Sequence, residues 1–142
     1  MDEKKWINSF FGINRNDNIE SIKNFALLWN IFERYFCSMN ASLNIIKNKI
    51  YKLDEIGYNF PKKIHEDYYD YFHTRYVNQS DNSVNELFEN LNFRDNRTDI
   101  EYKALLKEIL ENPNSVIKNK LLANFIIIYR LRNNLFHGSK NI

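Results

Sequence analysis

Glycine, proline and cysteine are scarce in this chain of 142 residues, which contains three, two and one of them. An all-β fold needs many turns, so the scarcity of the first two argues against that class. Neither G-x-x-x-x-G-K nor G-x-G-x-x-G occurs, which disfavours a P-loop or Rossmann nucleotide site. The single cysteine, Cys37, excludes a disulfide framework within the chain and a cysteine-based zinc site.

Long apolar runs and a dominant charge are also missing. No unbroken apolar stretch is longer than residues 125–129, and this length is far too short to span a membrane. No apolar run follows the charged N-terminus, so we expect no signal peptide and a cytoplasmic protein. The formal net charge of +2 does not predict nucleic-acid binding, so any RNA contact must come from a local patch.

Helical periodicity is the strongest pattern that the sequence does contain. Apolar residues recur between Ile22 and Leu53 at alternating steps of three and four, as on one face of a helix. Either one helix of about forty residues covers this stretch, or two helices meet near residues 38–42. Asn18 is suited to cap the start of this stretch and Gly57 to end it.

Three helices are predicted downstream by the same spacing and by helix-start signals. One covers residues 62–77, after a turn at Pro61, and two follow capping-box patterns in which Ser83 and Thr98 each precede a glutamate by three positions. The apolar face of the first is expected to contain Ile64, Tyr68, Tyr71, Phe72 and Tyr76.

A last helix is predicted to begin after the breaker at residues 112–114, with Ser115 as its cap. It is expected to end at about His137, before Gly138. No segment alternates like a strand over more than a few residues. The predicted fold class is therefore all-α, a bundle of about four to six helices in one domain over residues 1–142, with two long helices bracketing shorter ones.

An arginine interrupts the apolar face expected for this last helix. At about 100° per residue, Arg132 falls inside an apolar stripe. That stripe consists of Leu121, Phe125, Ile128 and Leu135. A charge there is costly unless it is paired or faces a wet cleft, so Arg132 either pairs with a buried carboxylate, for instance Glu33, or serves a site.

The same segment combines Arg132 with a histidine, because residues 132–137 are Arg-Asn-Asn-Leu-Phe-His. An arginine binds phosphate through two parallel hydrogen bonds, and a histidine exchanges a proton near neutral pH. RNA carries its own nucleophile, the 2′-hydroxyl, so proton transfer and charge stabilisation are enough to cleave it. The pair therefore suits metal-independent cleavage of RNA.

This segment resembles the R-x4–6-H motif of HEPN domains, in the form in which a polar residue follows the arginine. HEPN domains are all-helical domains of prokaryotic toxins, phage-defence proteins and RNA-guided effectors, and of some eukaryotic proteins. The motif stands at the end of the last long helix, as in the family, and residues 25–33 are similar to the first-helix pattern of several HEPN groups. The resemblance covers the whole chain in outline and two short segments in detail.

The resemblance implies an endoribonuclease that needs no metal or cofactor and whose active site forms across a homodimer. Arg132 would hold the scissile phosphate, His137 would act as general acid or base, and Asn133 would orient one of them or bind phosphate. The expected products are a 2′,3′-cyclic phosphate and a 5′-hydroxyl. The family also implies a toxin–antitoxin or antiviral setting, with an antitoxin or sensor protein as partner. The alternative is a catalytically silent HEPN-like module that binds RNA or protein.

Arg130 competes with Arg132 for the phosphate-binding role. Arg132 and His137 diverge by about 140° on an ideal helix, whereas Arg130 and His137 share a face and satisfy the longer spacing of the motif. We favour Arg132 because Asn133 supplies the polar residue expected after the arginine, whereas Leu131 follows Arg130. A two-fold dimer can bring both subunits' residues into one cleft, where Arg130 would contact the RNA backbone.

Three other groups of residues could form a functional site, but each also has a simpler structural explanation. A carboxylate–histidine metal site is conceivable in one group, but we expect a solvated acidic face and no metal: His65, Glu66, Asp67, Asp70 and His73. A second group could stack on RNA bases, although packing is the favoured role: Tyr68, Tyr69, Tyr71 and Tyr76. The densest basic region is a weak candidate for phosphate contacts: Lys47, Lys49, Lys52, Lys62 and Lys63.

Overall fold

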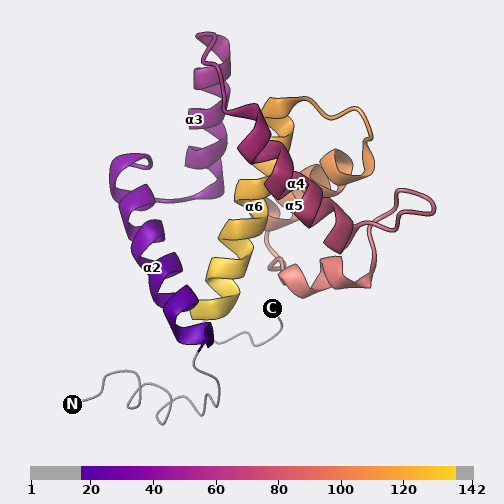
Figure 1. Cartoon of the computed structure of the whole chain (residues 1–142), viewed down its shortest axis with the longest axis horizontal. Coiled ribbons are helices and arrows are strands. Elements are labelled where there is room, and N and C mark those ends of the chain that lie inside the picture. The colour runs from indigo at the N-terminus through magenta and orange to yellow at the C-terminus, as the bar shows by residue number, and fades with distance from the viewer. Residues whose placement is uncertain (1–16, 137–142) are drawn as a thin grey trace. The chain divides into compact units, whose positions relative to one another are not determined.

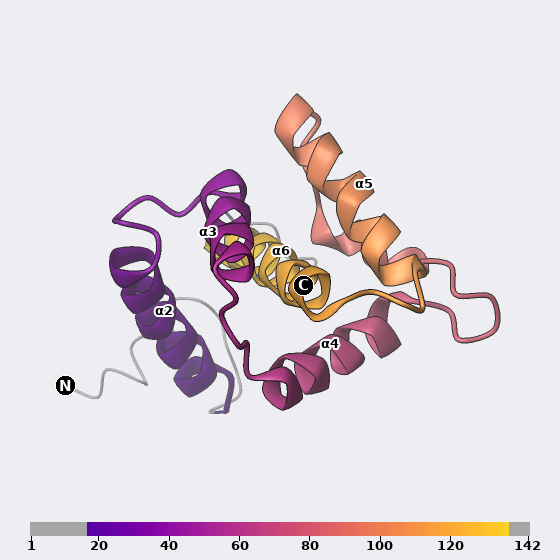
Figure 2. The ribbon, with the colours of Figure 1, turned by 90° about the horizontal axis from the view of Figure 1, so that it is seen from above.

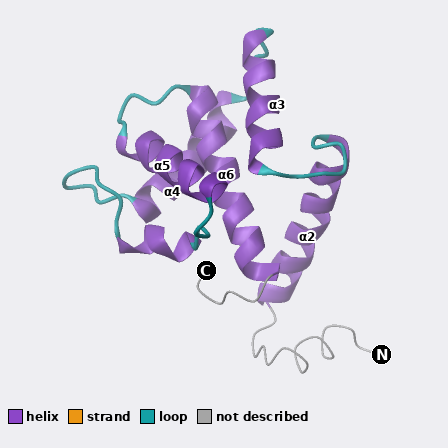
Figure 3. Cartoon of the chain, turned by 180° about the vertical axis from the view of Figure 1, so that it is seen from behind, coloured by secondary structure: helices purple, strands orange, loops and turns teal. Residues whose placement is uncertain are grey.

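The structure, a computed structural model, describes residues 17–136, which form helices joined by loops (Figures 1 and 3). Within these residues the β pairing is limited to one isolated antiparallel bridge between Val77 and Val84. The all-α prediction is therefore confirmed. The chain divides into two compact units, residues 1–42 and 43–142, so the single domain remains a prediction.

The first unit contains helix α2 (Asp17–Tyr35), and the long apolar stripe does not form one continuous helix. Ser38 and Met39 have φ angles of 52° and 72°, in the left-handed region that an α-helix of L-residues cannot continue through. The sequence alternative with two helices is therefore correct. Asn18 lies inside α2, so its prediction as the cap is wrong.

The second unit begins with helix α3 (Leu43–Glu55), whose C-terminus was predicted correctly. Gly57 adopts a φ of 77°, as expected for the residue after a helix. The Tyr58 amide donates to the Leu53 carbonyl at 2.9 Å and the Gly57 amide donates to the Asp54 carbonyl at 3.0 Å. These two bonds form a Schellman motif, which satisfies carbonyls that the helix leaves unpaired.

Helix α4 (Lys62–Tyr76) has the predicted bounds to within one residue, but its buried face differs from the prediction. Tyr69, Phe72 and Tyr76 are buried, whereas three residues of the predicted apolar face are exposed. These are Ile64, Tyr68 and Tyr71. The helix therefore carries apolar and aromatic side chains both toward the core and toward solvent.

A 3₁₀ helix, η1 (Glu86–Leu91), and helix α5 (Arg97–Glu111) follow, and both begin at asparagine caps. Asn85 Oδ1 accepts from the Leu87 amide at 3.0 Å, and Asn96 Oδ1 accepts from the Asp99 amide at 2.9 Å. The predicted caps Ser83 and Thr98 are therefore wrong.

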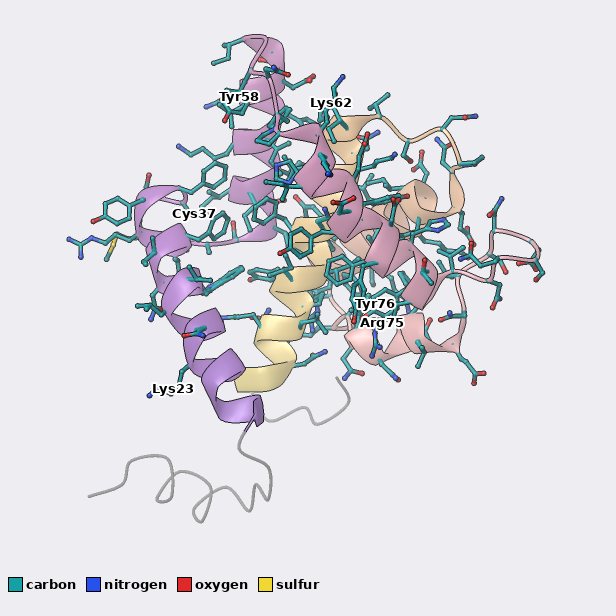
Figure 4. The ribbon with its side chains drawn as sticks, viewed as in Figure 1. Lys23, Cys37, Tyr58, Lys62, Arg75 and Tyr76 are labelled. Carbon is teal, nitrogen blue, oxygen red and sulfur yellow. The ribbon has the colours of Figure 1, made fainter. Side chains whose placement is uncertain are left out.

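Contacts with neighbouring segments explain why Asn85, and not Ser83, caps η1. The Ser83 hydroxyl donates to Asp81 Oδ1 within the preceding loop, at 2.7 Å. Asn85 Nδ2 donates to the Arg75 carbonyl at 2.9 Å, which fixes η1 against the end of α4 beside Arg75 and Tyr76 (Figure 4).

Helix α6 (Ile117–Phe136) is the centre of the second unit, where it contacts α3, α4, α5 and η1. Figure 2 looks along α6, with α3, α4 and α5 around it. Ser115 does not cap α6, because its hydroxyl donates to the Ile109 and Asn112 carbonyls at the end of α5. None of the helices that the structure describes is long and apolar enough to cross a membrane.

Candidate functional site

The two arginines near the end of α6 lie in different environments. Arg130 is 3% exposed, whereas Arg132 is half-buried. The most buried stripe of the helix contains Ala123, Ile127, Arg130 and Asn134, which follow one another at steps of four, three and four as one face requires. The arginine in the most buried stripe is therefore Arg130, whereas the projection that singled out Arg132 was centred on Phe125, which is half-buried.

Arg130 uses its guanidinium group to hold the end of η1. Nε donates to the Leu91 carbonyl at 3.1 Å, Nη2 donates to the Asn92 carbonyl, and Nη1 lies 3.3 Å from Asp99 Oδ2. The guanidinium carbon also lies 5.4 Å from the centroid of the Phe93 ring. All three nitrogen atoms thus have partners inside the chain, which is how a buried arginine becomes tolerable.

Asn134 acts on the same carbonyl groups from the next turn of α6. Its Nδ2 donates to the carbonyls of Asn90 and Leu91, each at 3.2 Å. Asn92 ends η1 in the left-handed conformation, with a φ of 51°. The last carbonyls of a helix have no donors within that helix. Here the side chains of Arg130 and Asn134 on α6 donate to them.

Asp99 connects the same network to α5. Its Oδ2 accepts from the Arg94 amide at 2.7 Å as well as from Arg130. Burial lowers the pKa of Arg130 and the Asp99 carboxylate opposes that shift, but an arginine stays protonated in proteins. Since its donors are used internally, Arg130 serves the fold, and the predicted RNA contact of Arg130 gains no support.

Arg132 and Asn133, in contrast, contact each other. Arg132 Nη1 donates to Asn133 Oδ1 at 3.2 Å, and Asn133 is 8% exposed. A buried amide oxygen at this distance restricts the directions in which the guanidinium can point. The two motif residues that the structure describes are therefore adjacent in space as well as in sequence.

Two parts of the predicted site are not tested by this geometry. His137 and Gly138 lie outside the described residues, so the distance between His137 and Arg132 stays open. Glu33, the suggested partner of Arg132, belongs to the first unit, and that pairing also stays a prediction.

The other predicted groups separate into buried and exposed members. Tyr69 and Tyr76 are buried, and the Tyr69 hydroxyl donates to the Ile109 carbonyl at 3.2 Å. Tyr68 and Tyr71 are exposed and border a surface hollow of about 680 Å³ on α4. In the part of the chain that the structure describes, no three His, Cys, Asp or Glu side chains are grouped closely enough to hold a metal ion.

No family model matches this chain, and neither a curated protein nor a solved structure was found to match it. The resemblance to HEPN domains therefore rests on the motif, its position in the chain and the helical fold.

Proposed function

We propose that this protein is a metal-independent endoribonuclease of the HEPN type that acts as a homodimer. The observation that carries the proposal is the contact between Arg132 Nη1 and Asn133 Oδ1 on the last helix. It supports Arg132 as the motif arginine, and the internal contacts of Arg130 argue against the competing candidate.

The proposed reaction uses the substrate's own hydroxyl group. A base takes the proton of the 2′-hydroxyl, the 2′-oxygen attacks phosphorus, and the bond to the 5′-oxygen breaks as that oxygen receives a proton. Arg132 stabilises the charge that develops on the phosphate, and Asn133 holds the guanidinium in place. His137 serves as the base or the acid. The products are a 2′,3′-cyclic phosphate and a 5′-hydroxyl.

Ideal helical geometry supports a homodimer. Residues five apart on an ideal helix diverge by about 140°, so Arg132 and His137 of one copy would point to different sides of a helix that continued to His137. A two-fold axis beside the helix end would bring the arginine of one subunit to the histidine of the other. Such a nuclease would act in a toxin–antitoxin or antiviral setting and would need a partner protein, an antitoxin or a sensor, to restrain it.

Incubation of the purified protein with unstructured RNA in EDTA tests the proposal. We expect cleavage that leaves cyclic phosphate and 5′-hydroxyl ends, and we expect its loss in His137→Ala with the circular dichroism spectrum unchanged. Cleavage that EDTA abolishes, or that His137→Ala leaves intact, would contradict the proposal. Sedimentation at micromolar concentration should give a dimer, and a stable monomer would exclude the shared site.

The second candidate function is a silent module that binds RNA or protein. The exposed Tyr68 and Tyr71 beside the hollow on α4 favour it, because exposed aromatic side chains at a surface depression are typical of binding sites. The same incubation separates the two, since this candidate predicts RNA or protein binding with no cleavage under any condition.

A further inference from the structure

Two lysines from different helices share one tyrosine ring at the junction of α3 and the first turn of α6. Lys118 Nζ lies 4.7 Å from the centroid of the Tyr51 ring, and Lys47 Nζ lies 5.4 Å from the same centroid. Such cation–π contacts orient ammonium groups that would otherwise move freely in solvent. Lys118 therefore lies close to Lys47 of the predicted basic region, although the sequence pattern did not place Lys118 in that region.

A buried tyrosine supports this pair from α5. Lys47 Nζ also lies 6.0 Å from the centroid of the Tyr102 ring. The Tyr102 hydroxyl donates to Asn44 Oδ1 at 2.7 Å, so the ring is tied to α3. Burial raises the pKa of Tyr102 to about 12, so its hydroxyl remains a neutral donor at physiological pH. The lysines thus rest on a framework made by three helices.

The pair carries more positive than negative charge. Asp54 Oδ2 lies 3.5 Å from Lys118 Nζ, and among the described residues no other carboxylate forms an ion pair with either lysine. The Lys118 side chain is 30% exposed, so an anion from solvent can reach it. Both ammonium groups lie beside the same ring, so an anion that approaches this ring is attracted by two positive charges.

We propose that Lys47 and Lys118 form a binding site for the phosphate backbone of single-stranded RNA. This inference rests on the proposed function, because it supplies a second contact for the same substrate. Lys118 and Arg132 are separated by about 21 Å along α6, at 1.5 Å per residue. The site therefore binds a distant part of the strand and fixes its position without reading its sequence.

Lys49 and Lys52 provide a matched control on the same helix. Both are exposed, and neither forms an ion pair or a cation–π contact with another residue that the structure describes. A double substitution to glutamine changes the net charge of the protein equally at either pair of lysines. Only the Lys47 and Lys118 pair has the orientation that a defined phosphate site requires.

The experiment measures RNA binding in the His137→Ala background, so that cleavage does not interfere. Fluorescence anisotropy with a labelled oligonucleotide of about 20 nucleotides, over a range of salt concentrations, gives the affinity and the salt slope. In Lys47→Gln/Lys118→Gln we expect affinity to fall about tenfold and the slope of log K against log salt to decrease by about 1.4, since each phosphate contact contributes about 0.7 on a single strand. In Lys49→Gln/Lys52→Gln we expect changes below about twofold, and Lys47→Arg/Lys118→Arg should retain most of the affinity.

Equal losses in the two glutamine pairs would overturn the site, because bulk charge would then explain the binding. Absence of RNA binding by the parent protein, or binding displaced by millimolar inorganic phosphate alone, would also overturn it. DNA of the same sequence should bind within a few-fold of RNA if the backbone is what is recognised. If the unmutated protein cleaves RNA but neither cleavage nor binding depends on Lys47 and Lys118, the phosphate site is refuted and the proposed nuclease function is not. If binding depends on these lysines but the unmutated protein does not cleave RNA, the nuclease function is refuted and the phosphate site is not.

Discussion

Arg130 and Arg132 stand two residues apart on α6, yet they belong to different parts of the molecule. Arg130 is buried, and its three guanidinium nitrogen atoms contact η1 and Asp99. Arg132 is half-buried, and its Nη1 donates to the neighbouring Asn133. The difference shows that two arginines on one helix can have different surroundings, and that only the contacts of Arg130 identified here hold the end of η1.

The comparison also explains why polar residues occur in the core stripe of α6. A helix end that abuts another element cannot satisfy its last carbonyls with water. Arg130 and Asn134 donate to the carbonyls of residues 90–92 at the end of η1. Polar side chains in the buried stripe of α6 therefore satisfy the carbonyls at the end of η1.

The largest effect is expected when Arg130 is changed to methionine. Arg130→Met removes the cation but leaves Asp99 and two carbonyls buried, so the free energy of unfolding should fall by about 3–5 kcal/mol. Urea denaturation measures it, and Arg132→Met should cost less than about 1 kcal/mol. Similar losses for the two variants would remove the distinction between the arginines. Adding Asp99→Asn to Arg130→Met should recover part of the loss, because the unpaired charge is then gone.

Asn134 and Asn133 form a second matched pair, one turn further along α6. Asn134→Ala leaves the Asn90 and Leu91 carbonyls without their donor, and the free energy of unfolding should fall by about 1–3 kcal/mol. The thermal midpoint of Asn133→Ala should change less than that of Asn134→Ala. A larger destabilisation by Asn133→Ala would mean that its contact with Arg132 is structural.

Asn133→Ala is expected to affect cleavage instead. Without Asn133 Oδ1 the guanidinium of Arg132 loses its orientation, so kcat for RNA cleavage should fall about tenfold while KM changes little. Initial rates over a range of RNA concentrations separate the two constants. An increased KM with unchanged kcat would assign Asn133 to substrate binding, and no change in either would exclude it from the site.

The smallest effect concerns an internal hydrogen bond that involves neither arginine. The pKa of Tyr102 is raised from 10.0 to about 12 in the folded protein, so the unfolded chain loses this proton first as the pH rises. The stabilisation is therefore present below pH 10 and is lost between pH 10 and 12. Urea unfolding across this window should show a weaker pH dependence in Tyr102→Phe than in the unmutated protein. The exposed Tyr68→Phe should behave as the unmutated protein, and identical curves for all three would refute the prediction.

The sequence predicted those parts of the fold that depend on local spacing. The bounds of α4, the C-terminal turn at Gly57 and the break at residues 112–114 follow from periodicity and from glycine or proline nearby. The caps of η1 and α5 were misplaced because Asn85 and Asn96 compete with the Ser83 and Thr98 patterns. Amide and hydroxyl side chains offer similar acceptors, so neighbouring contacts decide which one caps the helix.

The interior contacts could not be predicted because they join distant segments. The Arg130 partner Leu91 is 39 residues away in the sequence, and nothing in either segment identifies the other. The exposed face of α4 was missed for a related reason, since tyrosines occur on both sides of that helix. A projection centred on Ile127 instead of Phe125 would have placed Arg130 in the core. In the candidate site, the motif spacing identified Arg132 and Asn133, and the structure adds their contact.

The most direct test of the central claim is single-turnover cleavage of unstructured RNA in EDTA by Arg132→Gln, at a temperature where it and the unmutated protein are both folded. We predict that the unmutated protein cleaves and that Arg132→Gln is slower by a factor of about 100–1000, as when one donor to a developing oxyanion is removed. Folding should be retained, because Arg132 lies outside the buried network. Cleavage by Arg132→Gln at the unmutated rate, or no metal-independent cleavage by either protein, would contradict the account.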